Sequence, residues 1–149
     1  MSPDDLDPKE FGLLSELRET DLEVLFDLLE PRKLARGRKV FREGSEADGL
    51  VLLAEGQIEI SGNRSDERFV LGRGAVLGGL SLVTIGPREL TATTLEPCML
   101  WRLPRDHWRR LTDDHPRTAC RLLEAILNET ATHLRETLDA LSGNAAGPE

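Results

Sequence analysis

The sequence predicts a mainly β domain, a roll or sandwich of short strands, with helices before and after it. Apolar residues fall at helical spacing over residues 11–29. Over residues 32–103, short apolar runs alternate with glycine-containing turns, a pattern typical of sandwiches and rolls. After Pro104 the helical period returns. We therefore expect helices, then a β-roll, then helices.

Length and composition are those of one globular domain. The chain has 149 residues, enough for its own hydrophobic core, with 39% hydrophobic and 31% charged residues. No apolar run approaches the roughly 18–20 residues that span a bilayer. The acidic N-terminus lacks the basic and apolar regions of a secretion signal. We therefore expect a cytoplasmic protein that does not bind membranes.

The N-terminal helical region is expected to hold two helices. Residues 1–9 are polar and contain proline, so we expect a flexible tail there. Thr20 followed by Glu23 matches a capping box, which predicts that the second helix begins at Thr20. Pro31 is expected to end it.

The middle region is expected to form strands separated by turns. The polar segment 61–66 is typical of a hairpin loop. The candidate strands are residues 40–41, 50–54, 57–60, 68–71, 90–95 and 98–103.

The C-terminal region is expected to hold a short helix over residues 105–111 and a long one that Pro116 opens. The long helix is expected to run to about Leu141. The composition of residues 142–149 is typical of a second flexible tail. The predicted organisation is therefore a domain over residues 10–141 between two tails.

The glycine spacings carry a resemblance to a known family. Residues 37–60 read GRKVFREGSEADGLVLLAEGQIEI, residues 71–80 read LGRGAVLGGL and residues 86–89 read GPRE. These motifs resemble the cyclic-nucleotide-binding domain family, which includes the catabolite activator protein, the kinase A regulatory subunit and cyclic-nucleotide-gated channels. The resemblance covers residues 11–141. It implies an eight-stranded, jelly-roll-like β-roll with N-terminal helices, a short helix inside the roll, and B and C helices after it.

The resemblance also implies a phosphate-binding cassette over residues 78–89. A short helix starting near Gly78 would aim unpaired N–H groups at a phosphate. Arg88 would form a charge-assisted bond to that phosphate, although a surface salt bridge is the alternative for this side chain. The candidate ligand is cyclic AMP or cyclic GMP. The cassette positions are Gly78, Gly79, Leu80, Ser81, Arg88 and Glu89.

Two cassette positions depart from the family pattern. Gly79 stands where the family has the glutamate that grips the ribose 2′-hydroxyl, and losing such a bond weakens binding roughly ten- to over a hundredfold. Glu89 stands where the family has a small residue. A carboxylate about 4 Å from the phosphate costs up to about 4 kcal/mol, unless it pairs with Arg88 or points outward along the strand. We therefore expect weak or no cyclic nucleotide binding in the family's usual mode.

The last helix carries an apolar seam at heptad spacing, flanked by charged residues. In the family's bacterial activators the corresponding helix forms the dimer, so the resemblance implies a homodimer. The alternative is that this face only covers the roll. The seam consists of Cys120, Leu127, Ala131, Leu134, Leu138 and Leu141.

Charge and cysteine usage restrict the partners. The net charge of -8 disfavours polyanionic partners. The basic cluster considered as a phosphate footprint is Arg102, Arg105, Arg109 and Arg110, which interleaves with Trp101 and Trp108. We expect these arginines to be solvated and the tryptophans to pack inward, rather than to stack on bases. Cys98 and Cys120 are interpreted as reduced core residues.

The leading functional hypothesis is a non-enzymatic regulatory module that acts on a partner protein. The alternative is a working cyclic AMP or cyclic GMP sensor that signals to a separate partner. A DNA reader would need about 60 more residues after the long helix, so we expect no DNA binding by the chain itself. We expect neither a metal nor a catalytic residue, because His107, His115 and His133 fall on predicted helices or at their boundary.

Overall fold

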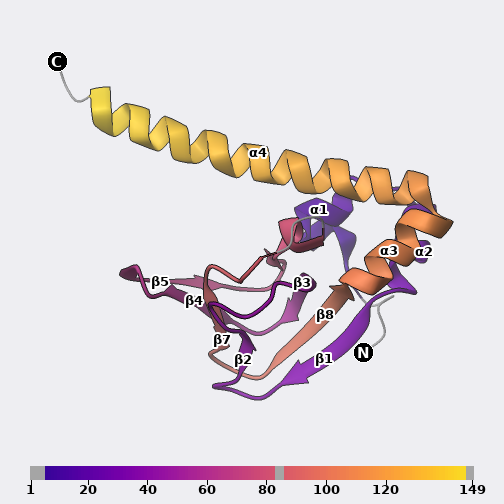
Figure 1. The fold of residues 1–149 in the computed structure, drawn as a ribbon, viewed down its shortest axis with the longest axis horizontal. Helices are drawn as coiled ribbons and strands as arrows, with labels where there is room; N and C mark the ends of the chain where they lie inside the picture. The colour runs from indigo at the N-terminus through magenta and orange to yellow at the C-terminus, as the bar shows by residue number, and fades with distance from the viewer. Residues whose placement is uncertain (1–5, 83–85, 147–149) are drawn as a thin grey trace.

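The described strands form two four-stranded antiparallel sheets that close into a roll (Figure 1). The computed structural model describes residues 6–82 and 86–146, and all of their side chains except those of residues 65, 80, 81 and 143–146. The strand orders are β1-β8-β3-β6 and β2-β7-β4-β5. The eight-stranded roll with flanking helices is therefore confirmed. The strands are β1 (Glu30–Leu34), β2 (Lys39–Phe41), β3 (Gly49–Glu55), β4 (Ile58–Gly62), β5 (Ser65–Leu71), β6 (Val76–Leu77), β7 (Thr91–Thr94) and β8 (Cys98–Pro104).

Strand β3 separates two hydrophobic cores. Leu50 and Leu52 face the helices, whereas Val51 and Leu53 face the interior of the roll. All six residues from Gly49 to Ala54 are buried, because both faces of the strand are covered. This explains why the sequence shows an uninterrupted apolar run here rather than an alternation.

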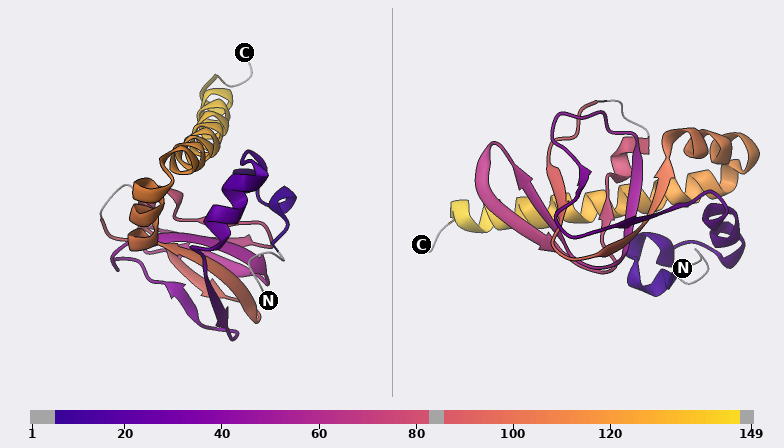
Figure 2. Two further views of the ribbon diagram at one scale, coloured as in Figure 1. Left: turned by 90° about the vertical axis from the view of Figure 1, so that its right-hand side faces the viewer. Right: turned by 90° about the horizontal axis from the view of Figure 1, so that it is seen from below.

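The helices lie on one side of the roll, as the two views of Figure 2 show. The first part of α4 packs on α1, α2 and α3, while its C-terminal part projects beyond the sheets (Figure 1). Among the described helices, none combines the length and the apolar character that crossing a bilayer requires. The helices are the 3-10 turns η2 (Pro8–Glu10) and η3 (Gly79–Leu82), and α1 (Gly12–Ser15), α2 (Glu19–Phe26), α3 (Arg105–Asp114) and α4 (Pro116–Ala146).

The two ends of the chain differ from the expected tails. Leu6 is buried in the helix-side core, and Pro8–Glu10 form η2, so the chain is packed from residue 6 onward. Helix α4 opens at Pro116 as predicted but continues to Ala146, through the first residues of the expected C-terminal tail. Residues 1–5 and 147–149 lie outside the described part of the chain.

The predicted start of the second helix was wrong. Helix α2 begins at Glu19 with Arg18 as its N-cap, and the Arg18 N–H donates to the Asp21 carboxylate at 3.1 Å. The Thr20–Glu23 capping box does not form because Thr20 already lies inside the helix. Asp21 at the third helical position supplies the carboxylate that such a box needs.

Three predictions within the roll also need correction. Pro31 does not end a helix but lies in β1, at the edge of its sheet, where a missing N–H is tolerated. The two-residue strand β6 was not predicted. The expected loop 61–66 is mostly strand, because Gly62 pairs with Ser65 across a tight turn.

Asp21 ties α2 to α4. Its side chain is 2% exposed and accepts hydrogen bonds from Thr118 Oγ1 at 2.6 Å and from the Arg121 guanidinium at 3.0 Å. Burial by itself raises the pKa of Asp21, but the hydrogen bonds from Thr118, the Arg18 N–H and Arg121 outweigh it and hold that pKa below 3.8. The carboxylate is therefore charged and fully partnered between the two helices.

Replacing Asp21→Asn is expected to destabilise the fold by about 1–3 kcal/mol, because Arg121 and Thr118 lose a charged acceptor. The folded pKa lies below the unfolded one, so the stabilisation is present above about pH 4–5 and is lost as the pH falls through the folded pKa. Urea denaturation at several pH values measures both effects. The exposed Asp113→Asn variant is the control, and an equal loss of stability in both variants would contradict the prediction.

Candidate functional site

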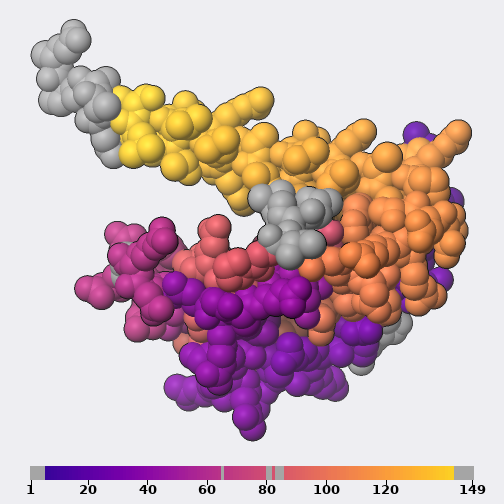
Figure 3. Space-filling model, viewed as in Figure 1, coloured from indigo at the N-terminus to yellow at the C-terminus, as the bar shows by residue number. Residues whose placement is uncertain are grey.

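A pocket of about 840 Å³ opens on the roll beneath the second half of α4. Figure 3 shows the hollow between that half of the helix and the β4–β5 part of the roll. Apolar side chains dominate its wall, with Arg88 and Glu89 as the charged groups. An apolar cavity with few polar groups is typical of a small-molecule site. The lining residues are Phe41, Ala47, Ile60, Leu71, Val76, Leu77, Gly78, Gly79, Gly86, Pro87, Arg88, Glu89 and Leu90.

Backbone bonds place Arg88 on the pocket wall. The Arg88 N–H donates to Ser45 O at 2.6 Å, and its carbonyl accepts from the Gly44 N–H at 2.8 Å. The Ala47 N–H donates to Gly86 O at 2.9 Å, so the two segments run side by side. The position of Arg88 is therefore fixed by the loop that precedes β3.

Neighbours from two segments, Phe41 in β2 and Asp48–Gly49 at the start of β3, contact the guanidinium of Arg88. It is 8% exposed, donates to Gly49 O at 3.0 Å and lies 4.3 Å from the centroid of the Phe41 ring. Asp48 Oδ1 lies 3.6 Å from Arg88 Nη2, while Asp48 Oδ2 lies 2.7 Å from Arg102 Nη2. Asp48 thus bridges the pocket arginine to β8. The salt bridge weighed as the alternative for Arg88 exists, but it forms at the pocket wall.

The guanidinium of Arg88 lies among charges of both signs. Burial lowers the pKa of Arg88, Asp48 opposes the shift, and Arg102 and Arg105 lower that pKa further. Arginine stays protonated in proteins nevertheless. Asp48 lies beside Arg88 and Arg102, and Glu46 Oε1 lies 3.9 Å from Arg105 Nη1. With Glu89 on the same pocket wall, carboxylates offset most of the positive charge of these guanidinium groups.

Glu89 lies exposed on the pocket wall. The sequence left open whether Glu89 pairs with Arg88. Within the described part of the chain no ion pair joins the two residues, so that alternative does not occur. Its negative charge opposes an anionic ligand that approaches Arg88.

A short helix follows β6, as expected near Gly78, and it is a single 3-10 turn. Gly78 has a φ of 74°, which favours glycine, and the four-residue 3-10 turn η3 begins at Gly79. Leu80 and Ser81 lie in the backbone of η3, but their side chains fall outside the described residues, as does the whole of 83–85.

Gly79 contacts α4 as well as the pocket. A Cβ atom at position 79 would lie 3.2 Å from Ile126 Cγ2 and 3.9 Å from Leu50 Cδ1. A side chain there would therefore start against α4, and the ribose-gripping glutamate of the family pattern could enter only if Ile126 moved. The absence of a side chain at position 79 therefore lets η3 lie close to α4.

The heptad seam of α4 faces away from the roll. Helix α4 buries Leu122, Ala125 and Ile126, and Leu127 lies about 140° around the helix from Leu122. The core interpretation of Cys120 was wrong, because this side chain is exposed along the same seam. Ala131 is half-buried. The exposed leucines are Leu127 (54%), Leu134 (57%), Leu138 (52%) and Leu141 (59%).

The tryptophans of the basic cluster pack inward, as predicted. Trp101 is 1% and Trp108 is 7% exposed. Arg102 is paired with Asp48, and Arg105 Nη2 donates to Ala47 O at 2.7 Å. Residues 32–39 carry five further exposed cations, which sequence reasoning did not single out.

Sequence reasoning missed the two residues that hold Arg88 in place. Asp48 and Phe41 lie more than 35 positions from Arg88, so no local spacing links them. The position of Asp48 directly before a buried strand is the sequence feature that could have marked it as a candidate site residue.

Comparison with known proteins agrees with this fold. A family model described as "Cyclic nucleotide-binding domain" matches residues 31–115, more than half of the chain. The CRP-like cAMP-activated global transcriptional regulator of Mycobacterium tuberculosis is 28% identical over 135 residues, which cover 88% of this chain. The chain spans 58% of the length of that relative.

Solved structures show the same architecture. The N-terminal domain of a transcriptional regulator from Streptomyces coelicolor A3(2) has a TM-score of 0.75 and 29% identity, covering 90% of this chain and 96% of that one. The regulatory domain of Toxoplasma gondii PKA, crystallised with cAMP, has a TM-score of 0.61 and 28% identity, covering 68% of this chain and 40% of that one.

The contact between Gly79 and α4 can be measured by a double-mutant cycle that combines Gly79→Ala with Ile126→Ala. Gly79→Ala is expected to cost about 1 kcal/mol more when Ile126 is present than when it has been truncated, because the added Cβ crowds Ile126 Cγ2. Chemical denaturation of the four proteins gives the coupling energy. Gly72→Ala in the same two backgrounds is the control, since nothing lies within 4 Å of a Cβ there. A coupling energy near zero at position 79 would disprove the contact.

Proposed function

Because the chain belongs to the cyclic nucleotide-binding domain family, we propose that it is a non-enzymatic regulatory module whose pocket binds cyclic nucleotides weakly or not at all. It acts in the cytoplasm through contacts with a partner protein. The observation that carries the proposal is the state of Arg88, whose guanidinium is already partnered by Asp48, Gly49 O and Phe41.

A cyclic phosphate meets two obstacles in this pocket. It competes with Asp48 for the guanidinium of Arg88, and it approaches the exposed carboxylate of Glu89. The ribose has no carboxylate at position 79 to accept its hydroxyl hydrogen bond. Each deficit weakens binding by roughly tenfold or more.

A working cyclic AMP or cyclic GMP sensor is the second candidate. The pocket volume of about 840 Å³ falls within the range of small-molecule sites. The charged Arg88 on the pocket wall also favours an anionic ligand. This candidate requires that the ligand displace Asp48 from Arg88 and that Glu89 turn away.

The exposed seam of α4 supports a homodimer. Four leucines that are more than half exposed line one face of α4, along the part of the helix that follows its buried stripe. Leucine repeats of this spacing pair with a second copy of the same helix, which removes their apolar surface from water. The position of the seam, away from the roll, leaves it open to that second copy.

Cyclic AMP is expected to bind no tighter than about 100 μM, from the losses given above. Glu89→Ala is expected to raise the affinity a few-fold, up to roughly tenfold, because it removes a like charge from the wall. Isothermal titration calorimetry measures both values.

Glu55→Ala, at the exposed last residue of β3 and outside the pocket, is the control for the loss of one negative charge. Low-micromolar binding by the unmodified chain would refute the degenerate pocket and favour the sensor. An equal gain in both variants would show that Glu89 acts only through the net charge.

Leu134→Asp is expected to convert a dimer into a monomer, because a carboxylate in the seam must be desolvated against apolar side chains. Light scattering at tens of micromolar gives the mass, and the β signal in circular dichroism reports the fold.

Thr132→Asp places the same charge about 160° away around α4 and is the matched control. A monomer mass for the unmodified chain, or dissociation by both substitutions, would disprove the leucine seam as the interface.

A further inference from the structure

The β1–β2 connection is the most basic part of the chain. Five cations fall within eight residues and no carboxylate interrupts them, whereas the whole chain has a net charge of -8. Without these five charges the remainder would carry -13, so this segment is basic within an acidic chain. All five residues are exposed. This basic ribbon consists of Arg32, Lys33, Arg36, Arg38 and Lys39.

The charges of the basic ribbon are not neutralised by the protein. Within the described part of the chain, none of the five side chains forms an ion pair. Arg32 Nη1 donates to Val40 O at 3.5 Å and Lys39 Nζ donates to Thr93 Oγ1 at 2.9 Å, and both acceptors are neutral. Repulsion among the cations therefore remains until an anionic partner arrives.

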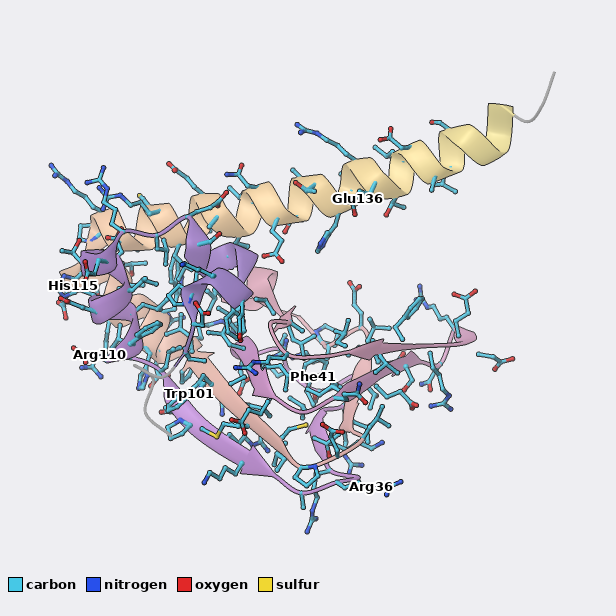
Figure 4. All side chains as sticks on the ribbon, turned by 180° about the vertical axis from the view of Figure 1, so that it is seen from behind. Arg36, Phe41, Trp101, Arg110, His115 and Glu136 are labelled. Carbon is cyan, nitrogen blue, oxygen red and sulfur yellow. The ribbon has the colours of Figure 1, made fainter. Side chains whose placement is uncertain are left out.

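The basic ribbon lies apart from the pocket and from α4. Strand β1 is at the edge of one sheet and β2 at the edge of the other. Figure 4 shows Arg36 at the tip that joins them, on the far side of the roll from Glu136 of α4. An object bound at this tip leaves both the pocket and the leucine seam open.

The surroundings favour a short acidic peptide over nucleic acid. The exposed carboxylates of Glu55, at the end of β3, and Glu96, in the turn before β8, lie at the same end of the sheet as the end of β1. A duplex carries one charge per ~1.7 Å and extends far beyond this narrow tip, so its phosphates would meet these carboxylates. A short peptide can end within the ribbon.

The side chains of the basic ribbon also point in different directions. Neighbours on a strand, such as Arg32 and Lys33, face opposite sides of the sheet. A flexible peptide can place carboxylates on both sides of such an edge, whereas a rigid phosphate backbone contacts one side. Arginine guanidinium groups suit carboxylates because two parallel N–H groups match the two oxygens.

We propose that the basic ribbon is a docking surface for an acidic segment of a partner protein. The exposed edge of β1 supplies backbone groups beside the cations, so an extended segment can also add as a strand there. The inference is independent of nucleotide binding in the pocket.

Fluorescence anisotropy of the full chain with a labelled peptide tests the proposal. The probe is about a dozen residues long and half Glu or Asp, in about 0.05 M salt, where screening is weak. Neutralising three cations, Lys33→Ser with Arg36→Ser and Arg38→Ser, is expected to weaken binding roughly tenfold or more. Raising the salt to about 0.15 M is expected to weaken the unmodified chain's binding as well.

The matched control replaces three exposed arginines elsewhere, Arg109→Ser with Arg110→Ser and Arg117→Ser, and so changes the net charge equally. Binding is expected to survive in this control. The single variant Arg36→Ser, in the turn outside both strands, repeats the test if the triple variant fails to fold.

Three results would overturn the proposal. One is the absence of peptide binding by the unmodified chain, and the second is an equal loss in the ribbon and control variants. The third is tighter binding of a labelled DNA duplex of about 20 base pairs than of the peptide, which would make the ribbon a nucleic-acid surface.

Discussion

The whole molecule depends on the pairing of β3 with β8. Their residues alternate between the helix-side core and the interior of the roll, so this one antiparallel pair holds both cores together. Leu52 and Trp101, which pair in register, face the helices and are almost fully buried. The loop that enters β3 carries Asp48, and β8 carries Arg102, so the salt bridge beside the pocket is anchored on the same two strands.

The two halves of helix α4 lie in different environments, the first packed on the helical core and the second exposed. Its first turns bury one stripe against the helical core, and Asp21 fixes them through Thr118 and Arg121. Beyond Ile126 the buried stripe continues as a polar face. Glu129, Thr130 and His133 on this face line a cleft of about 180 Å³ next to Gly79. The apolar residues move instead to the outer face. A helix that only covered the roll would keep its leucines on the inner side.

The sequence was informative where one local rule decides the structure. The apolar run of β3, the proline that opens α4 and the glycine rhythm of the roll each have a local cause. The sequence was not informative where a strand forms only because it pairs with another strand. Strand β1 carries a proline and is exposed, and two-residue β6 forms through its pairing with β3. For the site, Arg88 could be located from its motif, but its partners could not. Asp48 reaches it through a backbone pairing of two distant loops, which leaves no periodic signal.

The pocket is fixed to the scaffold at both of its ends. The Arg88 loop is tied through Asp48 to β3 and β8, which cannot shift without disturbing both cores. The η3 turn is held against α4 because position 79 has no side chain, so an occupant that pushed η3 outward would press first on Ile126. Ile126 belongs to the buried stripe of α4, one residue before the first exposed leucine of the seam. Gly79 lines the pocket beside Ile126, so a larger residue at position 79 would press on the helix that carries the seam.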